Sequence, residues 1–163
     1  MDNRGTFGGH RIVVGVDGTA PSKSALRWAI HQARLTGASV DAVTGYRIPP
    51  PLYQPPKMVA GVDIKDFEES ACRILTEAVS DVSDVSATDS EVQVAQQVIH
   101  GNPAKVLVDA ADGADLLVLG NRGHGGFTEA LLGSVGQHCV QHARCPVVLI
   151  RSEEPEPDDE HER

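Results

Sequence analysis

The chain has 163 residues, of which 40% are hydrophobic and 23% charged, and its formal net charge at pH 7 is −9. This length and composition are typical of one globular domain, and they argue against a membrane protein because no apolar stretch approaches the roughly 20 residues that cross a bilayer. The sequence also lacks the basic face that nucleic-acid binding requires, so we expect neither a nucleic acid nor a membrane as partner.

The two ends of the chain differ from the rest in composition. Residues 1–10 contain one arginine and lack the apolar segment of a secretory signal, so we expect a flexible tail and a cytoplasmic protein. Residues 152–163 hold seven acids and one arginine, which gives −6 and leaves −3 for the rest. We therefore predict one domain over 11–151, followed by a disordered acidic tail. The three cysteines have no metal-type spacing and fit reduced thiols.

In chain order, the first half of the sequence predicts two strand and helix pairs. The apolar run Ile12–Val16 is typical of a strand buried on both faces. Thr19 as a capping residue and Pro21 in the first turn predict the helix that follows, and Gly37 ends it. The expected bounds are strands over 11–17 and 39–45, helices over 19–37 and 67–82, and a proline-rich loop over 46–62.

The second half predicts three more strands separated by two helices. Val92, Val94 and Val98 alternate with polar residues, which indicates a strand at a sheet edge. Asn102 and Pro103 form a cap and first-turn pair for the next helix. The expected strands cover residues 92–98, 115–119 and 146–151. The expected helices cover residues 102–113, where Gly113 ends the helix, and residues 135–144. Strands that alternate with amphipathic helices predict an α/β fold, a parallel sheet with helices on both faces.

Residues 120–134 contain two glycine turns between the fourth strand and the fourth helix. Without a Cβ at Gly120, Gly123, Gly125 and Gly126, successive amide N–H groups can point into one concavity that binds an anion. A helix that starts at Ser134 adds free N–H groups, a positive dipole end and a hydroxyl. The alternative interpretation is a plain connecting loop.

A sheet of this type binds ligands beyond the carboxyl ends of its strands, where the winding direction reverses. If the first and fourth strands are neighbours, Asp17 and the loop after Gly120 line the same crevice. Asp17 can then coordinate Mg²⁺ or a ribose hydroxyl, but an Asp before Gly-Thr is also a common turn former. Arg122 is either a phosphate clamp or a solvated loop residue.

Other residues offer weaker signals of chemistry. His138 and His142 stand four apart beside Cys139, either as a zinc site or as ordinary helix histidines. His124 is either a general base or a simple phosphate contact. The sequence has neither a P-loop nor a dinucleotide fingerprint. The sequence therefore favours a ligand-binding protein over an enzyme. The alternative is an ATPase or a nucleotide-transfer enzyme that uses Asp17 and His124.

The spacing Gly120-x2-Gly123-x9-Gly133-Ser134 resembles the ATP-binding signature of the universal stress protein family. The resemblance extends to the segments 12–19, 101–104 and 145–148 and covers roughly residues 10–151. It implies an open five-stranded parallel sheet in the order 3-2-1-4-5, of the Rossmann-like or adenine nucleotide alpha hydrolase-like kind, usually in a dimer. The nucleotide is then expected at the switch point.

The resemblance and the glycine pattern together imply a set of nucleotide-binding residues. These are Gly15, Asp17, Gly45, Gly120, Arg122, Gly123, Gly125, Gly133, Ser134 and Val135. We expect a regulatory stress-response protein that binds ATP, with Mg²⁺ as a further ligand, and hydrolyses it slowly at most. A cyclic-AMP or other adenylate binder is the remaining alternative. The apolar last strand at the sheet edge predicts a homodimer that pairs through residues 146–151.

Overall fold

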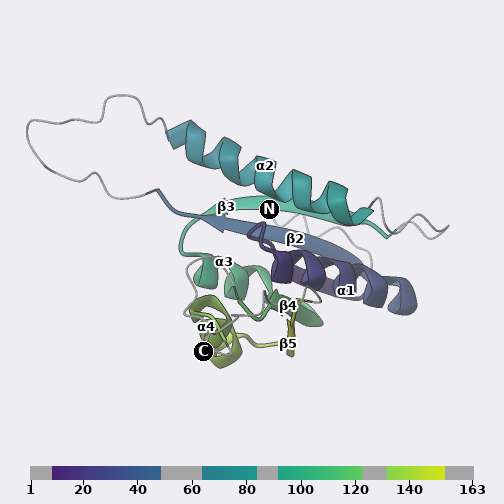
Figure 1. Ribbon diagram of the computed structural model, residues 1–163. Helices are drawn as coiled ribbons and strands as arrows, with labels where there is room; N and C mark the ends of the chain where they lie inside the picture. Colours follow the sequence, from purple (N-terminus) through teal and green to yellow (C-terminus); the bar gives the residue numbers. More distant parts are fainter. Residues whose placement is uncertain (1–8, 49–63, 84–91, 123–131, 153–163) are drawn as a thin grey trace, which may run out of the picture.

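The structure, a computed structural model, describes residues 9–48, 64–83, 92–122 and 132–152 (Figure 1). Within these ranges strands and helices alternate along the chain. The elements are β1 (Arg11–Gly15), α1 (Ala20–Thr36), β2 (Ser39–Tyr46), α2 (Ile64–Ser83), β3 (Val94–His100), α3 (Pro103–Ala110), β4 (Leu116–Gly120), α4 (Ser134–His142) and β5 (Val147–Ile150). Most of each predicted tail and most of the predicted loop over 46–62 lie outside the described residues.

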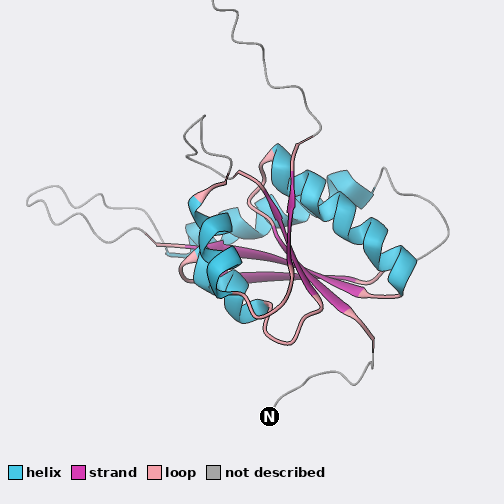
Figure 2. Ribbon diagram, turned by 90° about the horizontal axis from the view of Figure 1, so that it is seen from below, coloured by secondary structure: helices cyan, strands magenta, loops and turns pink. Residues whose placement is uncertain are grey.

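The strands form one parallel sheet in the order β3-β2-β1-β4-β5. Figure 2 shows the strands gathered in one sheet with helices on either side of it. Val14 in the central strand pairs with Ala42 on one side and Val118 on the other. The predicted fold is therefore confirmed, including the adjacency of β1 and β4 and the edge position of β3. Because the chain leaves β1 toward β2 and later returns beside β1 as β4, the winding reverses between β1 and β4.

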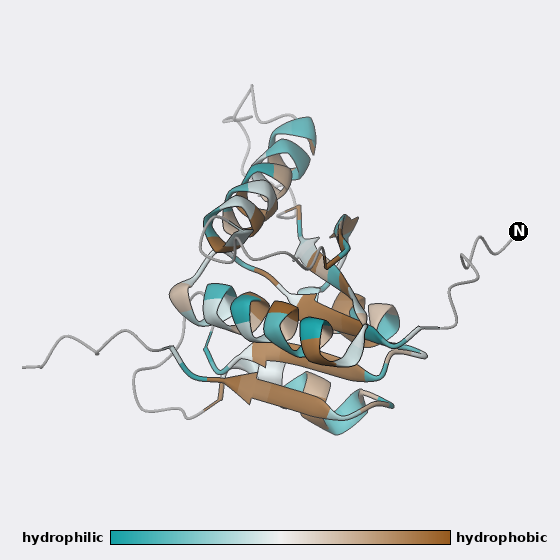
Figure 3. Ribbon diagram, turned by 90° about the vertical axis from the view of Figure 1, so that its right-hand side faces the viewer, coloured by the Kyte–Doolittle hydropathy of each residue, from teal (hydrophilic) through white to brown (hydrophobic). Residues whose placement is uncertain are grey.

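Each face of the sheet is covered by a pair of helices. Residues of α1 and α2, such as Leu26 and Leu75, pack with Ile12 and Val14 in one apolar cluster. Leu107 of α3 and Cys139 of α4 pack with Val13 in a second cluster on the other face. Successive residues of β1 thus enter opposite cores, as strand geometry requires, and the strands are largely apolar (Figure 3).

The predicted starts of two helices are confirmed. The Thr19 hydroxyl accepts a hydrogen bond from the Ser22 N–H at 3.4 Å at the start of α1, and the Asn102 side chain accepts one from Ala104 at 3.0 Å at the start of α3. Gly37 ends the first helix with a left-handed φ of 71°. These helix ends could be predicted because each capping residue lies within a few residues of the backbone group to which it bonds.

Several predicted boundaries were wrong. The second helix, predicted over 67–82, begins at Ile64. The third helix ends at Ala110, where the Ala111 N–H bonds to Leu107, and Gly113, with a φ of 76°, shapes the turn into β4 instead of capping the helix. Strand β3 is shifted by two residues, from 92–98 to Val94–His100, because it pairs with β2 as far as Tyr46. Sheet register, a long-range property, sets this boundary.

Arg11 joins four segments at the amino-terminal edge of the sheet. Its guanidinium donates to Asp41 at 3.0 Å, to the Ala110 carbonyl at 3.0 Å and to the Asp112 carbonyl at 2.9 Å. Its backbone N–H donates to Asp115 at 2.7 Å and so lowers the pKa of that carboxyl. This network fixes the starts of β1, β2 and β4, at the opposite edge from the predicted ligand side.

Candidate functional site

The turn after β1 is built around Asp17. One Asp17 carboxylate oxygen accepts hydrogen bonds from the Thr19 N–H at 3.0 Å and from the Thr19 hydroxyl at 2.5 Å. The buried Ser22 hydroxyl accepts the Asp17 N–H at 3.3 Å and donates to the Thr19 carbonyl at 2.9 Å. The turn-forming role of Asp17 is thus real, and it holds a half-buried carboxylate at the carboxyl edge of the sheet.

The end of β4 lies directly against this turn. A Cβ on Gly120 would lie 2.7 Å from the Pro21 carbonyl carbon and 2.9 Å from its oxygen. The backbone φ of Gly120 is not positive, so this glycine is required by close approach. The sequence pattern offered positive φ and close approach together, and only the second applies at Gly120.

The start of α4 lies beside the end of β4, although eleven residues separate Asn121 from Gly133. The Gly133 N–H donates to the Asn121 carbonyl at 3.1 Å, and the Asn121 N–H donates to Ile150 at 2.9 Å. Gly133 is the N-cap of α4, and the helix's own ladder begins with the Gln137 N–H on the Gly133 carbonyl at 2.9 Å. The N–H groups of Ser134 and Val135 precede that ladder and have no partner within the helix.

The role of Gly133 thus differs in part from the direct nucleotide contact that its sequence position predicted. Its own N–H is already bonded to Asn121, so donors for an anion come from the residues that follow it. Arg122 is half-buried at the end of β4. Gly123 and Gly125, with Gly126 and His124, lie outside the described residues.

Gly15 and Gly45, the two remaining predicted contacts, have packing roles. A Cβ on Gly15 would lie 2.7 Å from a Leu119 methyl and 2.9 Å from a Leu107 methyl. A Cβ on Gly45 would lie 2.8 Å from the Pro103 Cα, at the start of α3. Gly15 ends β1 next to the Asp17 turn, whereas Gly45 lies on β2, on the side of β1 away from β4.

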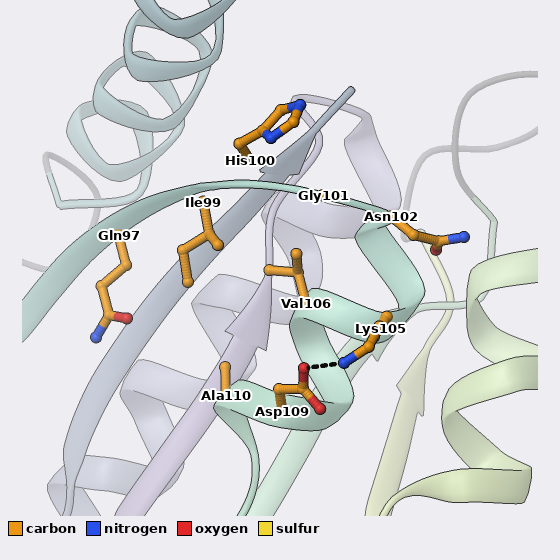
Figure 4. Close-up of a pocket in the computed structure, with 9 residues that line it drawn as sticks. All are labelled: Gln97, Ile99, His100, Gly101, Asn102, Lys105, Val106, Asp109 and Ala110. Carbon is orange, nitrogen blue, oxygen red and sulfur yellow. Dashed lines mark hydrogen bonds and ion pairs between the residues drawn. The ribbon is translucent and has the colours of Figure 1, made fainter. Parts of the chain in front are cut away.

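A separate pocket of about 470 Å³ opens between the carboxyl half of β3 and α3 (Figure 4). Its lining residues are Gln97, Ile99, His100, Gly101, Asn102, Lys105, Val106, Asp109 and Ala110. Lys105 and Asp109 form an ion pair at 2.6 Å along its α3 side. Among the predicted nucleotide contacts that the structure describes, none lines this pocket, which lies on the β3 side of the sheet, away from the switch point between β1 and β4.

The structure removes Cys139 from the zinc site that the sequence offered as an alternative. Cys139 is buried, its thiol donates to the Ala104 carbonyl at 3.8 Å, and burial raises its pKa to about 11. His138 and His142 are exposed. Cys139 therefore points into the core, away from the two imidazoles, and no cluster of three or more His, Cys, Asp or Glu side chains suited to a metal occurs among the described residues.

Sequence reasoning missed Pro21, Ser22 and Asn121 as parts of the site. Both Pro21 and Ser22 lie in the first turn of the predicted helix, yet Pro21 packs against Gly120 and the Ser22 hydroxyl holds the Asp17 turn. The signal that could have identified them is their position in the first turn after β1, on the ligand side of the sheet.

Comparisons with known proteins agree with this fold. Residues 9–151 match the sequence profile of the Universal stress protein family. A universal stress protein of Mycobacterium tuberculosis is 31% identical over 160 residues, which cover 90% of this chain and 49% of the relative. The chain thus spans about half the length of the curated relatives it matches.

Two solved structures are similar over most of their length. A universal stress protein in complex with cAMP is 27% identical, with a TM-score of 0.61, and the match covers 88% of this chain and 98% of that one. The universal stress protein UspA from Lactobacillus plantarum shares the fold, with a TM-score of 0.62 and 23% identity. The match covers 87% of this chain and 97% of that one. Of the helices described, none has the length and apolar character to span a bilayer. The match over residues 9–151, together with the sheet order, places the chain in the universal stress protein family.

Proposed function

We propose that the chain binds an adenine nucleotide, with ATP as its ligand, at the carboxyl edge of the sheet between β1 and β4. The observation that carries the proposal is the Gly133 to Asn121 hydrogen bond, because it holds the start of α4 against the end of β4. The phosphates then meet the N–H groups of Ser134 and Val135 and the positive end of α4. Arg122 adds charge, Gly120 lets the end of β4 pack against Pro21 beside the Asp17 turn, and Gly123 and Gly125 are proposed to add backbone N–H donors for the phosphates.

In this proposal Asp17 faces the ribose or a phosphate-bound Mg²⁺. Its carboxylate is held by Thr19, so it is oriented before the ligand arrives. The backbone at Gly15 and Gly45 is also proposed to contact the nucleoside, on the side away from Leu107, Leu119 and Pro103, which fill the space where the two side chains would lie. Because two donors already engage one Asp17 oxygen, the residue suits binding better than proton abstraction, and we infer slow hydrolysis at most.

Nucleotide occupancy is the proposed regulatory signal of this stress-response module. Such a signal needs no fast turnover, because a ligand acts through its different affinity for two states of the protein. The three cysteines are free thiols, which supports a cytoplasmic setting.

Cyclic AMP is the second candidate ligand, favoured by the 27% identical relative that was solved in complex with cAMP. Calorimetric titration of the purified chain with ATP, with and without Mg²⁺, and then with cAMP distinguishes the two. We expect tighter binding of ATP with Mg²⁺. Tighter binding of cAMP would assign the site to a cyclic nucleotide, and binding of neither would refute the proposed function.

Substitution of Asp17 by asparagine tests its ligand role separately from its turn role. Asparagine keeps a side-chain oxygen for the Thr19 donors but loses the charge, so the fold should persist. We expect ATP affinity in Mg²⁺ to fall by about tenfold, since a charged hydrogen bond contributes about 1.5–3 kcal/mol. Calorimetry gives the affinity and thermal unfolding controls for the fold. Unchanged affinity in the folded variant would remove Asp17 from the site.

We further propose a homodimer that pairs through residues 146–151. β5 is an edge strand, Leu149 on it is 37% exposed and Val140 on the adjacent α4 is 50% exposed. Such an apolar edge is normally covered. Sedimentation velocity at micromolar concentration should show a dimer for the natural chain and a monomer for Leu149→Lys, with Leu35→Lys on α1 as a dimeric control. A monomeric natural chain would contradict the proposal.

A further inference from the structure

Two histidines on the last two turns of α4 form a contact that the nucleotide site does not use. His138 and His142 are four residues apart, so their side chains lie on one face of the helix. Their ring centroids are 4.3 Å apart, with the ring planes inclined at 42°. Both side chains are exposed. The pair therefore presents imidazole nitrogens to solvent at one point of the surface.

The separation of the rings matches that of two imidazoles sharing one metal ion. At a metal–nitrogen distance of about 2.0–2.1 Å and the nitrogen–metal–nitrogen angle near 90° that is typical of Cu²⁺ and Ni²⁺, the ring centres are roughly 4–5 Å apart. The observed 4.3 Å lies in this range. The two ring centres are therefore already at the separation that chelation of one ion requires.

The position of the pair on the helix also favours a cation. His142 is the last residue of α4, where the carbonyl groups of the last turn and the negative end of the helix dipole lie. A divalent cation at this end is stabilised, whereas one at the amino-terminal end, beside Ser134, would be repelled. The two ends of α4 thus suit ligands of opposite charge.

We propose that His138 and His142 bind one divalent transition-metal ion per chain as a chelating pair, with water in the remaining coordination positions. Cys139 is not a ligand, since its thiol lies in the core and bonds to Ala104. Two imidazoles and water suit Cu²⁺, Ni²⁺ and Zn²⁺, and the affinity for Cu²⁺ should exceed that for Ni²⁺. The site is distinct from the nucleotide site, and the proposal holds whether or not ATP binds.

Calorimetric titration of the full chain with Ni²⁺ tests the pair. We expect one ion per chain, and at least tenfold weaker binding in His138→Gln and in His142→Gln. His31→Gln, an exposed histidine on α1, serves as the control and should bind as the natural chain does. Equal affinity in either variant of the pair would overturn the proposal, as would the loss of binding in His31→Gln.

A second variant separates chelation from the mere number of histidines. The double substitution Val140→His with His142→Gln keeps the histidine count but places the two imidazoles two residues apart, where they do not face each other. We expect it to bind Ni²⁺ as weakly as His142→Gln alone, and its thermal unfolding should not rise when Ni²⁺ is added. Binding equal to that of the natural chain would show that the pair has no special role.

Discussion

Replacing Gly120 with alanine is expected to destabilise the fold by about 1–3 kcal/mol, the usual effect of adding a methyl group to a closely packed site. The new Cβ would lie 2.7 Å from the carbonyl carbon of Pro21. Because that neighbour is backbone in the first turn of α1, it cannot rotate away. The end of β4 and the turn after β1 would have to move apart, and nucleotide affinity should fall with the stability. Urea unfolding measures the change.

Two other glycines provide a graded control. Gly15→Ala meets only the ends of the Leu107 and Leu119 side chains, which can change rotamer, so it should cost less than Gly120→Ala. Gly9→Ala, at an exposed position with nothing within 4 Å, should leave the unfolding free energy nearly unchanged. Equal stability of the Gly120 and Gly9 variants would contradict the packing of β4 against Pro21.

The sequence predicted the features that depend on near neighbours. The strand and helix order, the sheet order implied by the family resemblance, and the caps at Thr19 and Asn102 are confirmed. Buried strands show as continuous apolar runs, and caps act within one turn, so both leave a signal in a short window. The adjacency of β1 and β4, which the residues alone left as a condition and the family resemblance implied, is confirmed, and it places Asp17 and Gly120 at one edge.

Features that depend on distant neighbours could not be predicted. The close approach of Gly45 to Pro103 joins residues 58 positions apart, and nothing near Gly45 in the sequence indicates it. The three hydrogen bonds of the Arg11 guanidinium likewise need the positions of Asp41, Ala110 and Asp112. The occupied N–H of Gly133 is a further case, because its acceptor at Asn121 lies beyond the glycine loop.

Val135→Pro is expected to weaken ATP binding by about tenfold to hundredfold while leaving the fold intact. Proline lacks the backbone N–H that is proposed to meet a phosphate oxygen, and a hydrogen bond to a charged group contributes about 1.5–3 kcal/mol. The first turn of a helix tolerates proline because its N–H groups have no partner within the helix. The chain itself provides the precedent, since Pro21 occupies the same position in α1 that Val135 occupies in α4.

Val135→Ala is the matched control, because it also removes the valine side chain but keeps the N–H. Thermal unfolding should show the two variants to be similarly stable. The difference in ATP affinity between the two variants then reports the contribution of the Val135 N–H. The packing of the valine side chain in the core beneath α3 and α4 is lost in both variants and does not enter the comparison.

The most direct measurement is therefore the calorimetric dissociation constant for ATP of Val135→Pro against Val135→Ala, each confirmed as folded. If main-chain amides at the start of α4 hold the phosphates, the proline variant binds at least tenfold more weakly than the alanine variant. Equal affinities in the two folded proteins would show that the start of α4 does not hold the ligand.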